Sequence, residues 1–314
     1  MATASKKAAN TKSTEAAEEA KVQSTSTAVA VKNQSTAVAA PDFLSAEDMG
    51  VGFEGAGQDA FAIPFLQILQ KMSPIVDEDN PKYVKGAKAG MVYNTVTGKL
   101  YDIKESSDPD SKSTPLELVQ AAYKHSFILW GARDGEQGGF KGEITPDEMD
   151  AIIARDEVEN VDGKLLVKDA QGNTDPKKSD YYADTRSHFV VAIDNETGEA
   201  MNAILSLAST QIKSSKALMT SLNSKKVNIG GRIGTPATYA NKILFTTGVA
   251  SNDKGTWSTA KFALDGLVTD PEVFAQAKAF HKAITSGAAK ADYSKSVETG
   301  EGSVGDQPKQ AEGF

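Results

Sequence analysis

Two apolar runs joined by a polar turn, HFVVAIDNETGEAMNAILSL at residues 188–207, constrain the fold of this chain more than any other stretch. Both runs are rich in β-branched and apolar residues, and the turn holds Asn, Thr and Gly, which favour tight reversals. Similar pairs of runs occur in AGMVYNTVTGKLYD at 89–102, which turns near Thr97–Gly98, and in KILFTTGVASNDKGTWSTAKFAL at 242–264. PLELVQAAYKHSFILWG at 115–131 reads as one or two more strands. The sequence therefore predicts several antiparallel strands joined by turns.

Three other stretches predict helices. FLQILQKM at 65–72 has apolar residues at helical spacing between two prolines, and STQIKSSKALMTSLNSKK at 209–226 has an amphipathic pattern. DPEVFAQAKAFHKAITSG places Asp270 at the N-cap, Pro271 at the first helical position and Gly287 just past the end. Strands, helices and long loops together indicate an α+β or small-barrel architecture that is mainly β.

Composition changes along the chain and divides it into parts. Residues 1–57 are rich in Ala, Ser, Thr, Lys and Glu and have few aromatic residues, so we expect a disordered N-terminal arm. Residues 58–290 are expected to form one folded domain, with an acidic insertion at about 136–182. Residues 291–314 are polar and Gly-rich, which predicts a flexible acidic C-terminal tail.

Several classes of function are excluded or disfavoured by what the sequence lacks. There is no cysteine, which rules out disulfides and thiolate chemistry, and the three histidines are too scattered to suggest a metal site. No apolar run is long enough to span a membrane and no secretory signal is recognisable, so we expect an intracellular protein. No catalytic motif is present, and we predict a non-enzyme without cofactor or metal.

One acidic cluster leaves an enzyme reading open. TPDEMDAIIARDEVE contains six acids between Asp147 and Glu159, which could hold magnesium in a nuclease. The alternative is a solvated face at the start of a helix, where acidic side chains are favoured, and this interpretation is preferred.

Positive charge is concentrated in one window of an acidic chain. The net charge is −8, yet residues 201–252 contain six basic residues and no Asp or Glu. A window at +6 leaves −14 on the rest of the chain. Uncompensated cations repel one another, so we expect an anionic ligand there. The alternative is a lysine-bearing face that serves only solubility.

Aromatic residues interleaved with lysines suggest what that ligand is. NPKYVKGAKAG sets lysines around Tyr83, and bases of single-stranded nucleic acid stack on such rings while ammonium groups contact phosphates. Duplex readers need a recognition helix or zinc finger, and none is recognisable. Trp130 is preferred as a stacking residue over Tyr93, Tyr123 and Trp257, although aromatic residues on strands more often pack in a core. The residues expected to bind nucleic acid are Lys82, Tyr83, Lys85, Lys88, Tyr93, Trp130, Arg133, Lys213, Lys216, Lys225, Lys226 and Arg232.

Residues 58–290 resemble a family of bacteriophage single-stranded DNA-binding proteins. The resemblance rests on QDAFAIPFLQILQKMSPIVDEDNPKYVKGAKAGMVYNTVTGKLYD, on SLASTQIKSSKALM, and on NDKGTW followed by AKAFHKAITSGAAKADY, about a third of the chain. It implies an oligonucleotide-binding (OB) fold-like antiparallel barrel that coats single-stranded DNA without sequence preference. The implied setting is phage DNA replication, recombination and repair in the host bacterial cytoplasm.

The resemblance also bears on partners. Single-stranded DNA-binding proteins often end in an acidic tail tipped by Phe that recruits replication or recombination proteins, and this chain ends at Phe314. Its final acids are sparse and interrupted by Lys309, which departs from that pattern. The rival interpretation from another class is a phage virion or assembly protein whose basic patch and flexible ends bind other proteins.

Overall fold

The computed structural model describes residues 45, 47, 51–52, 61–106, 113–132, 138–161, 163–253 and 255–296. The chain divides into two units, residues 1–35 and 36–314, and every described residue lies in the second. The predicted disordered N-terminal arm therefore falls almost wholly outside the described residues. Of the predicted flexible tail, 291–314, only residues 291–296 are described, and there Tyr293 is 2% exposed and packs in a core cluster. Arg133 and Phe314 lie outside the described residues as well.

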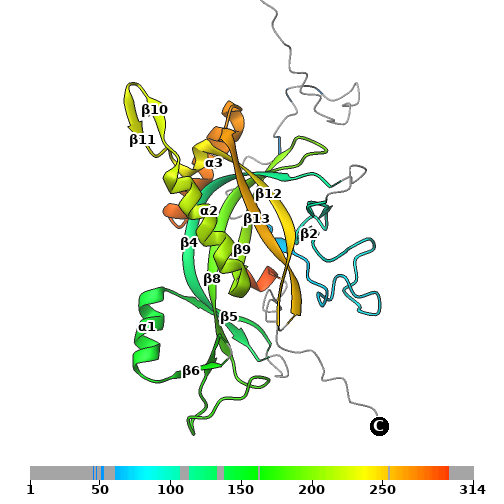
Figure 1. The fold of residues 1–314 in the computed structure, drawn as a ribbon, viewed down its shortest axis with the longest axis vertical. Coiled ribbons are helices and arrows are strands. Elements are labelled where there is room, and N and C mark those ends of the chain that lie inside the picture. Colours follow the sequence, from blue (N-terminus) through cyan, green and yellow to red (C-terminus); the bar gives the residue numbers. More distant parts are fainter. Residues whose placement is uncertain are drawn as a thin grey trace, which may run out of the picture. The chain divides into compact units, whose positions relative to one another are not determined.

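Two long antiparallel strands form the centre of an eight-stranded sheet (Figure 1). They are β4 (Leu116–Gly131) and β8 (Tyr181–Ile193), which pair from Glu117↔Ile193 to Trp130↔Tyr181. Near the start of β4, β12 (Asn241–Asn252) pairs with it and carries β13 (Gly255–Leu267) on its other side. Along the second half of β8 runs β9 (Ala200–Ala208). The predicted hairpins at 188–207 and 242–264 are thus confirmed.

The other ends of the two long strands carry a second group of elements. β5 (Gly139–Ile144) pairs with the end of β4, and β7 (Lys164–Val167) pairs with the start of β8 and with β6 (Val158–Val161). Between β5 and β6 lies α1 (Pro146–Ala154). The acidic stretch 136–182 therefore contributes strands to the same sheet.

A small three-stranded sheet brings a correction to the sequence analysis. Residues 65–72 are not a helix, because β1 (Leu66–Ile68) pairs with β2 (Val92–Asn94), which in turn pairs with β3 (Leu100–Tyr101). Met72, the last of the apolar residues at helical spacing, is 68% exposed. A short apolar run fits the periodicity of a helix as well as that of a strand. Here pairing with the confirmed β2–β3 hairpin makes the run a strand.

The small sheet closes the curled sheet into a barrel-like ring. On one side Phe65 bridges to Ile204 of β9, and on the other Lys104 bridges to Thr247 of β12. Backbone bonds reinforce both joints, from Ile204 N to Pro64 O at 2.9 Å and from Glu105 N to Thr247 O at 2.8 Å. The molecule is therefore an α+β protein, mainly β, with a barrel-like antiparallel sheet, as the sequence predicted.

The β2–β3 and β8–β9 hairpins use the same turn chemistry. Asn94 Oδ1 accepts from the backbone N–H groups two and three residues later, and Asp194 Oδ1 does the same in its own turn. Lys99 then joins the two hairpins, with its Nζ 2.6 Å from Asp194 Oδ2 and 2.8 Å from Glu196 Oε2. Burial opposes the charge of Lys99, but these carboxylates raise its pKa to about 12.

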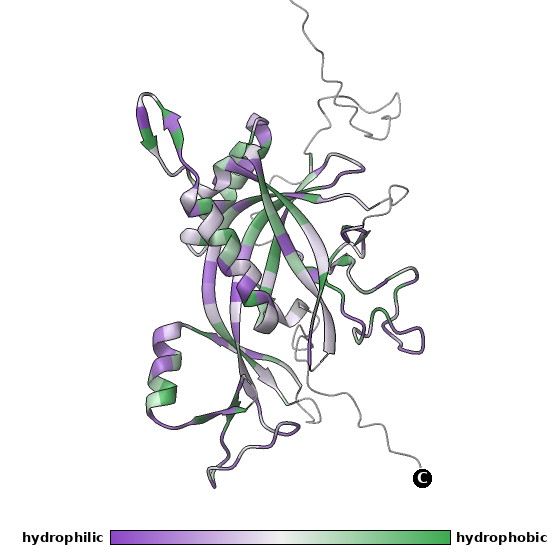
Figure 2. Cartoon of the chain, viewed as in Figure 1, coloured by the Kyte–Doolittle hydropathy of each residue, from purple (hydrophilic) through white to green (hydrophobic). Residues whose placement is uncertain are grey.

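Both faces of the β4–β8 pair are buried at residues 118–122 of β4 and 189–192 of β8, whereas Tyr123 and Lys124 in the middle of β4 are exposed. Leu118 and Val190 face the inside of the ring, where the main core cluster lies. Val119 and Val191 face α3 (Pro271–Thr285), whose predicted N-cap, Asp270, accepts from Glu272 N at 2.8 Å. Figure 2 shows both apolar and polar stretches along the long strands of the sheet. None of the helices in the described ranges is long and apolar enough to cross a membrane.

Candidate nucleic-acid interface

The lysine-rich stretch forms helix α2 (Ile212–Ser224), as predicted. It follows β9 through a 3-10 turn, Ser209–Gln211, and buries Ser215, Leu218 and Leu222 against the ring. Lys213 and Lys216 are on its exposed side. Lys213 lies in the first turn, where the helix dipole disfavours a cation, and no acid in that turn compensates it. The position of this lysine is therefore not explained by helix stability.

A buried histidine fixes α2 to the sheet. His188 of β8 is fully buried, with Nδ1 2.8 Å from Gln120 Oε1 and Nε2 2.8 Å from Ser215 Oγ. With the amide oxygen of Gln120 as acceptor, Nδ1 carries the proton and Nε2 accepts from the Ser215 hydroxyl. Burial lowers the pKa of His188 to about 4, so the ring is neutral at pH 7. The histidine has a structural role, which positions the lysine helix.

Gln211 fixes the same helix to the edge strand β13. Its Nε2 donates to Ser258 O at 2.7 Å, and its Oε1 accepts from Ala260 N at 2.9 Å. Gln70 also bonds Ser258, since its Oε1 accepts from Ser258 N at 2.8 Å and its Nε2 donates to Ser258 O at 3.0 Å. These side chains satisfy backbone groups at the edge of the sheet, and they hold α2 and β13 at a fixed separation.

A groove of about 790 Å³ runs between α2 and the β12–β13 hairpin; we call it the α2–β13 groove. Its walls include Lys213, Ser214 and Ser221 on α2, and Trp257 and Lys261 on β13. Trp257, Thr259 and Lys261 alternate along the strand and so share one of its faces. The groove thus combines an aromatic ring, hydroxyl groups and two lysines.

Lys261 lies flat across the neighbouring strand because Gly248 leaves room for it. A Cβ on Gly248 would lie 2.5 Å from Lys261 Cε, closer than any real contact. The Lys261 ammonium contacts the carboxylate of Glu105, and both side chains are about half exposed. An exposed pair of this kind contributes at most about 1 kcal/mol, so a phosphate can replace the carboxylate at little cost.

A second, smaller hollow of about 270 Å³ adjoins the first at Trp257; we call it the Lys71 hollow. Lys71 and Lys104 line it, together with Gly90 and Val249. Trp257 is partly exposed and belongs to both depressions. One indole therefore borders both a groove that contains two lysines and a hollow that contains two others.

Trp130, the preferred stacking residue of the sequence analysis, is not at the surface. It is 3% exposed and meets Phe140 edge to face at 6.3 Å between ring centroids. A base could not reach its ring, so Trp130 is corrected to a core residue and Trp257 takes its place as the candidate. The alternation of Trp257 with Lys261 in TWSTAK was the signal in the sequence that could have indicated this.

The remaining predicted residues lie in two other places. Lys82, Lys85 and Lys88 are exposed in the loops between β1 and β2, where Ala89, next to Lys88, lines the Lys71 hollow. In the same region the Tyr83 hydroxyl donates to Glu78 at 3.1 Å, and Tyr93 is partly buried against Leu69.

Lys225, Lys226 and Arg232 lie beyond the end of α2, outside the groove lining. None of these three residues forms an ion pair with an acid in the described part of the chain, and neither does Lys213 or Lys216. The sixth basic residue of the window differs, since Lys242 lies 2.7 Å from Asp265.

The acidic cluster at 147–159 is engaged in local structure. Glu148 closes a capping box with Thr145, Glu157 pairs with Arg155 at 2.5 Å, and Asp156 pairs with Lys168 at 2.7 Å. Across the described residues no group of three potential metal ligands is present. The nuclease alternative has no geometric support in this region.

Comparison with known protein families places most of the chain in one of them. The model of the Pam3 phage gp34-like protein family matches residues 31–290. The chain belongs to this family. As a gp34-like protein it is a phage protein, and the match covers the barrel-like ring, α2, α3 and the α2–β13 groove. Neither the curated proteins nor the solved structures contain a match.

Proposed function

We propose that this gp34-like protein binds single-stranded DNA without sequence specificity, in phage DNA replication, recombination and repair in the host bacterial cytoplasm. The observation that carries the proposal is that Trp257 borders both the α2–β13 groove and the Lys71 hollow, each of which contains two lysines. A base can stack on the indole while ammonium groups on both sides contact successive phosphates. The groove presents hydroxyl and ammonium groups without a set of fixed bidentate readers, which suits sequence-tolerant binding.

Two tryptophans allow the proposal to be tested by fluorescence. Trp130 is buried and Trp257 lines the groove, so in a Trp130→Phe variant the emission comes from Trp257 alone. Titration with oligo-dT should quench that emission, and the log-log salt slope should be about −0.7 for each phosphate contacted. Trp257→Ala should weaken binding by the equivalent of about 1 to 3 kcal/mol. A duplex of equal length is the control, and unquenched emission at saturating oligo-dT would refute the assignment of the groove.

A further inference from the structure

A two-stranded hairpin extends from the C-terminal end of α2 (Figure 1). It consists of β10 (Val227–Ile229) and β11 (Arg232–Gly234), which form a sheet of their own. In this hairpin Ile229 pairs with Arg232, and Asn228 pairs with Ile233. An isolated two-stranded hairpin is marginally stable in water, so a partner that covers it would stabilise it.

Each face of the hairpin carries one exposed isoleucine beside a polar residue. Residues paired across two strands share a face and successive residues alternate, so Ile229 lies on one face and Ile233 on the other. They are 69% and 76% exposed, more than any other large apolar residue of the described ranges. Figure 2 shows polar and apolar segments side by side on this hairpin. A flat protein surface would cover only one of the two faces, whereas insertion into a slot covers both.

The charge around the hairpin favours an anionic slot. Lys225 and Lys226 precede β10, Arg232 begins β11, and the nearest residues of the sequence contain no acid from 201 to 252. Lys226 is held at the base, where its Nζ lies 3.3 Å from Asn223 O, while Arg232 is exposed near the tip. An apolar wedge surrounded by cations is complementary to stacked bases surrounded by phosphates.

The tip of the hairpin is thin. Gly230 and Gly231 have φ of 58° and 84°, the left-handed pair of a type I′ turn. A Cβ at either position would meet nothing within 4 Å, so no crowding within the protein requires glycine there. Asn also suits the first position of such a turn. The two glycines leave the leading edge of the wedge without side chains.

We propose that this hairpin inserts between bases at the end of a DNA duplex, where the duplex continues into the single strand held in the α2–β13 groove. The proposal rests on the proposed function, since α2 leads from the groove directly to the hairpin. Bases offer flat apolar surfaces to Ile229 and Ile233 on the two faces of the wedge. The phosphates that border them attract Lys225, which precedes β10, and Arg232, which shares a face with Ile229. The terminal step of a duplex is the easiest to open, because it has stacking partners on one side only.

The test compares an oligo-dT strand, a blunt duplex, and the same duplex with an oligo-dT tail and 2-aminopurine in its last pair. Wild type should bind the tailed duplex about fivefold or more tightly than the tail alone and should raise 2-aminopurine emission as that base unstacks. The double variant Ile229→Ser, Ile233→Ser should lose both effects and keep its affinity for oligo-dT. Gly230→Asn, which retains the turn but thickens the tip, should reduce the emission change without altering oligo-dT binding.

The outcomes separate this proposal from the one on which it rests. If wild type does not bind oligo-dT, the proposed function fails. If wild type binds oligo-dT but leaves 2-aminopurine emission unchanged and shows no preference for the tailed duplex, only the wedge is refuted. If the isoleucine variants instead change the molar mass of the DNA-free protein in light scattering, the hairpin is a protein contact and the wedge is also refuted.

Discussion

His188 connects the protonation state of one residue to the position of the lysine helix. Its pKa of about 4 in the folded protein is below the 6.5 of an unperturbed imidazole because the ring is buried. Between pH 6.5 and pH 4 the unfolded chain therefore binds a proton that the folded protein does not. The contribution of His188 to stability is complete above pH 6.5 and falls as the pH decreases, by roughly 2 kcal/mol at pH 5.

Urea unfolding of wild type and His188→Gln at several pH values tests this linkage. At pH 7 the variant should be less stable by about 1 to 3 kcal/mol, since it disrupts the bonds to Gln120 and Ser215. The difference should narrow towards pH 5, where only wild type bears the cost of a neutral histidine. Ser187→Ala is the matched control, because it removes a buried bond to the Tyr293 hydroxyl at 2.6 Å without removing a group that titrates in this range. A difference that stays constant from pH 7 to pH 5 would contradict the linkage.

Individual binding residues were harder to predict from the sequence than helices and strands. Trp130 lies near the end of one β-rich run and Trp257 near the start of another, and only the alternation of Trp257 with Lys261 points to the ring that lines the groove. The distinction comes from pairing, because β5 covers the end of β4 whereas β13 lies at the edge of its sheet. Lys71 and Lys104 were missed for the same reason, since the ring closure that brings them to Trp257 joins distant segments.

At the scale of elements, periodicity and turn chemistry predicted most of the fold. The two hairpins whose turns begin with Asn94 or Asp194 and end in Thr-Gly were predicted correctly, because their signals are local. The capped helix α3 and the amphipathic helix α2 were predicted correctly for the same reason. β1 was not, since a three-residue strand between prolines has no period of its own and is determined by its partner.

The charge on α2 can be reversed without weakening the helix. Glu at position 213 would lie in the first turn, where an acid is favoured by the helix dipole, so loss of binding could not be attributed to unfolding. Lys213→Glu with Lys216→Glu should lower the affinity for oligo-dT about tenfold or more at physiological salt. The matched control is Lys177→Glu with Lys178→Glu, which changes the net charge equally on exposed lysines outside the groove lining. Affinity for oligo-dT is measured by fluorescence anisotropy. If the two double variants lost affinity equally, binding would depend only on the net charge of the protein.

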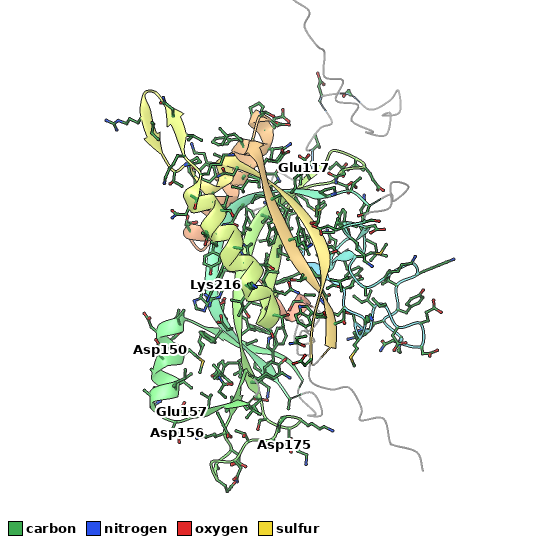
Figure 3. The ribbon with its side chains drawn as sticks, in the orientation of Figure 1. Glu117, Asp150, Asp156, Glu157, Asp175 and Lys216 are labelled. Carbon is green, nitrogen blue, oxygen red and sulfur yellow. The ribbon has the colours of Figure 1, made fainter. Side chains whose placement is uncertain are left out.

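At the scale of the whole described unit, charge is separated between its parts. Figure 3 shows Asp150, Asp156, Glu157 and Asp175 around α1 and the neighbouring strands, while Lys216 projects from α2. The two groups lie on elements attached to different parts of the long β4 and β8 strands. An acidic chain can therefore present a cationic groove, provided that salt screens the distant acids from a ligand bound there.

This separation predicts an effect of salt that only distant charges can produce. The double variant Asp147→Asn, Asp150→Asn removes two negative charges from α1. It should change the affinity for oligo-dT by less than about twofold at 0.15 M salt, where the screening length is about 8 Å. At 0.01 M salt, where the screening length is about 30 Å, the same variant should bind more tightly than wild type. Anisotropy titrations at both salt concentrations measure the two ratios, with circular dichroism to verify that α1 is intact. If the variant gained affinity equally at both concentrations, these acids would lie within direct reach of the bound strand, and the separation of cationic groove from acidic end would be wrong.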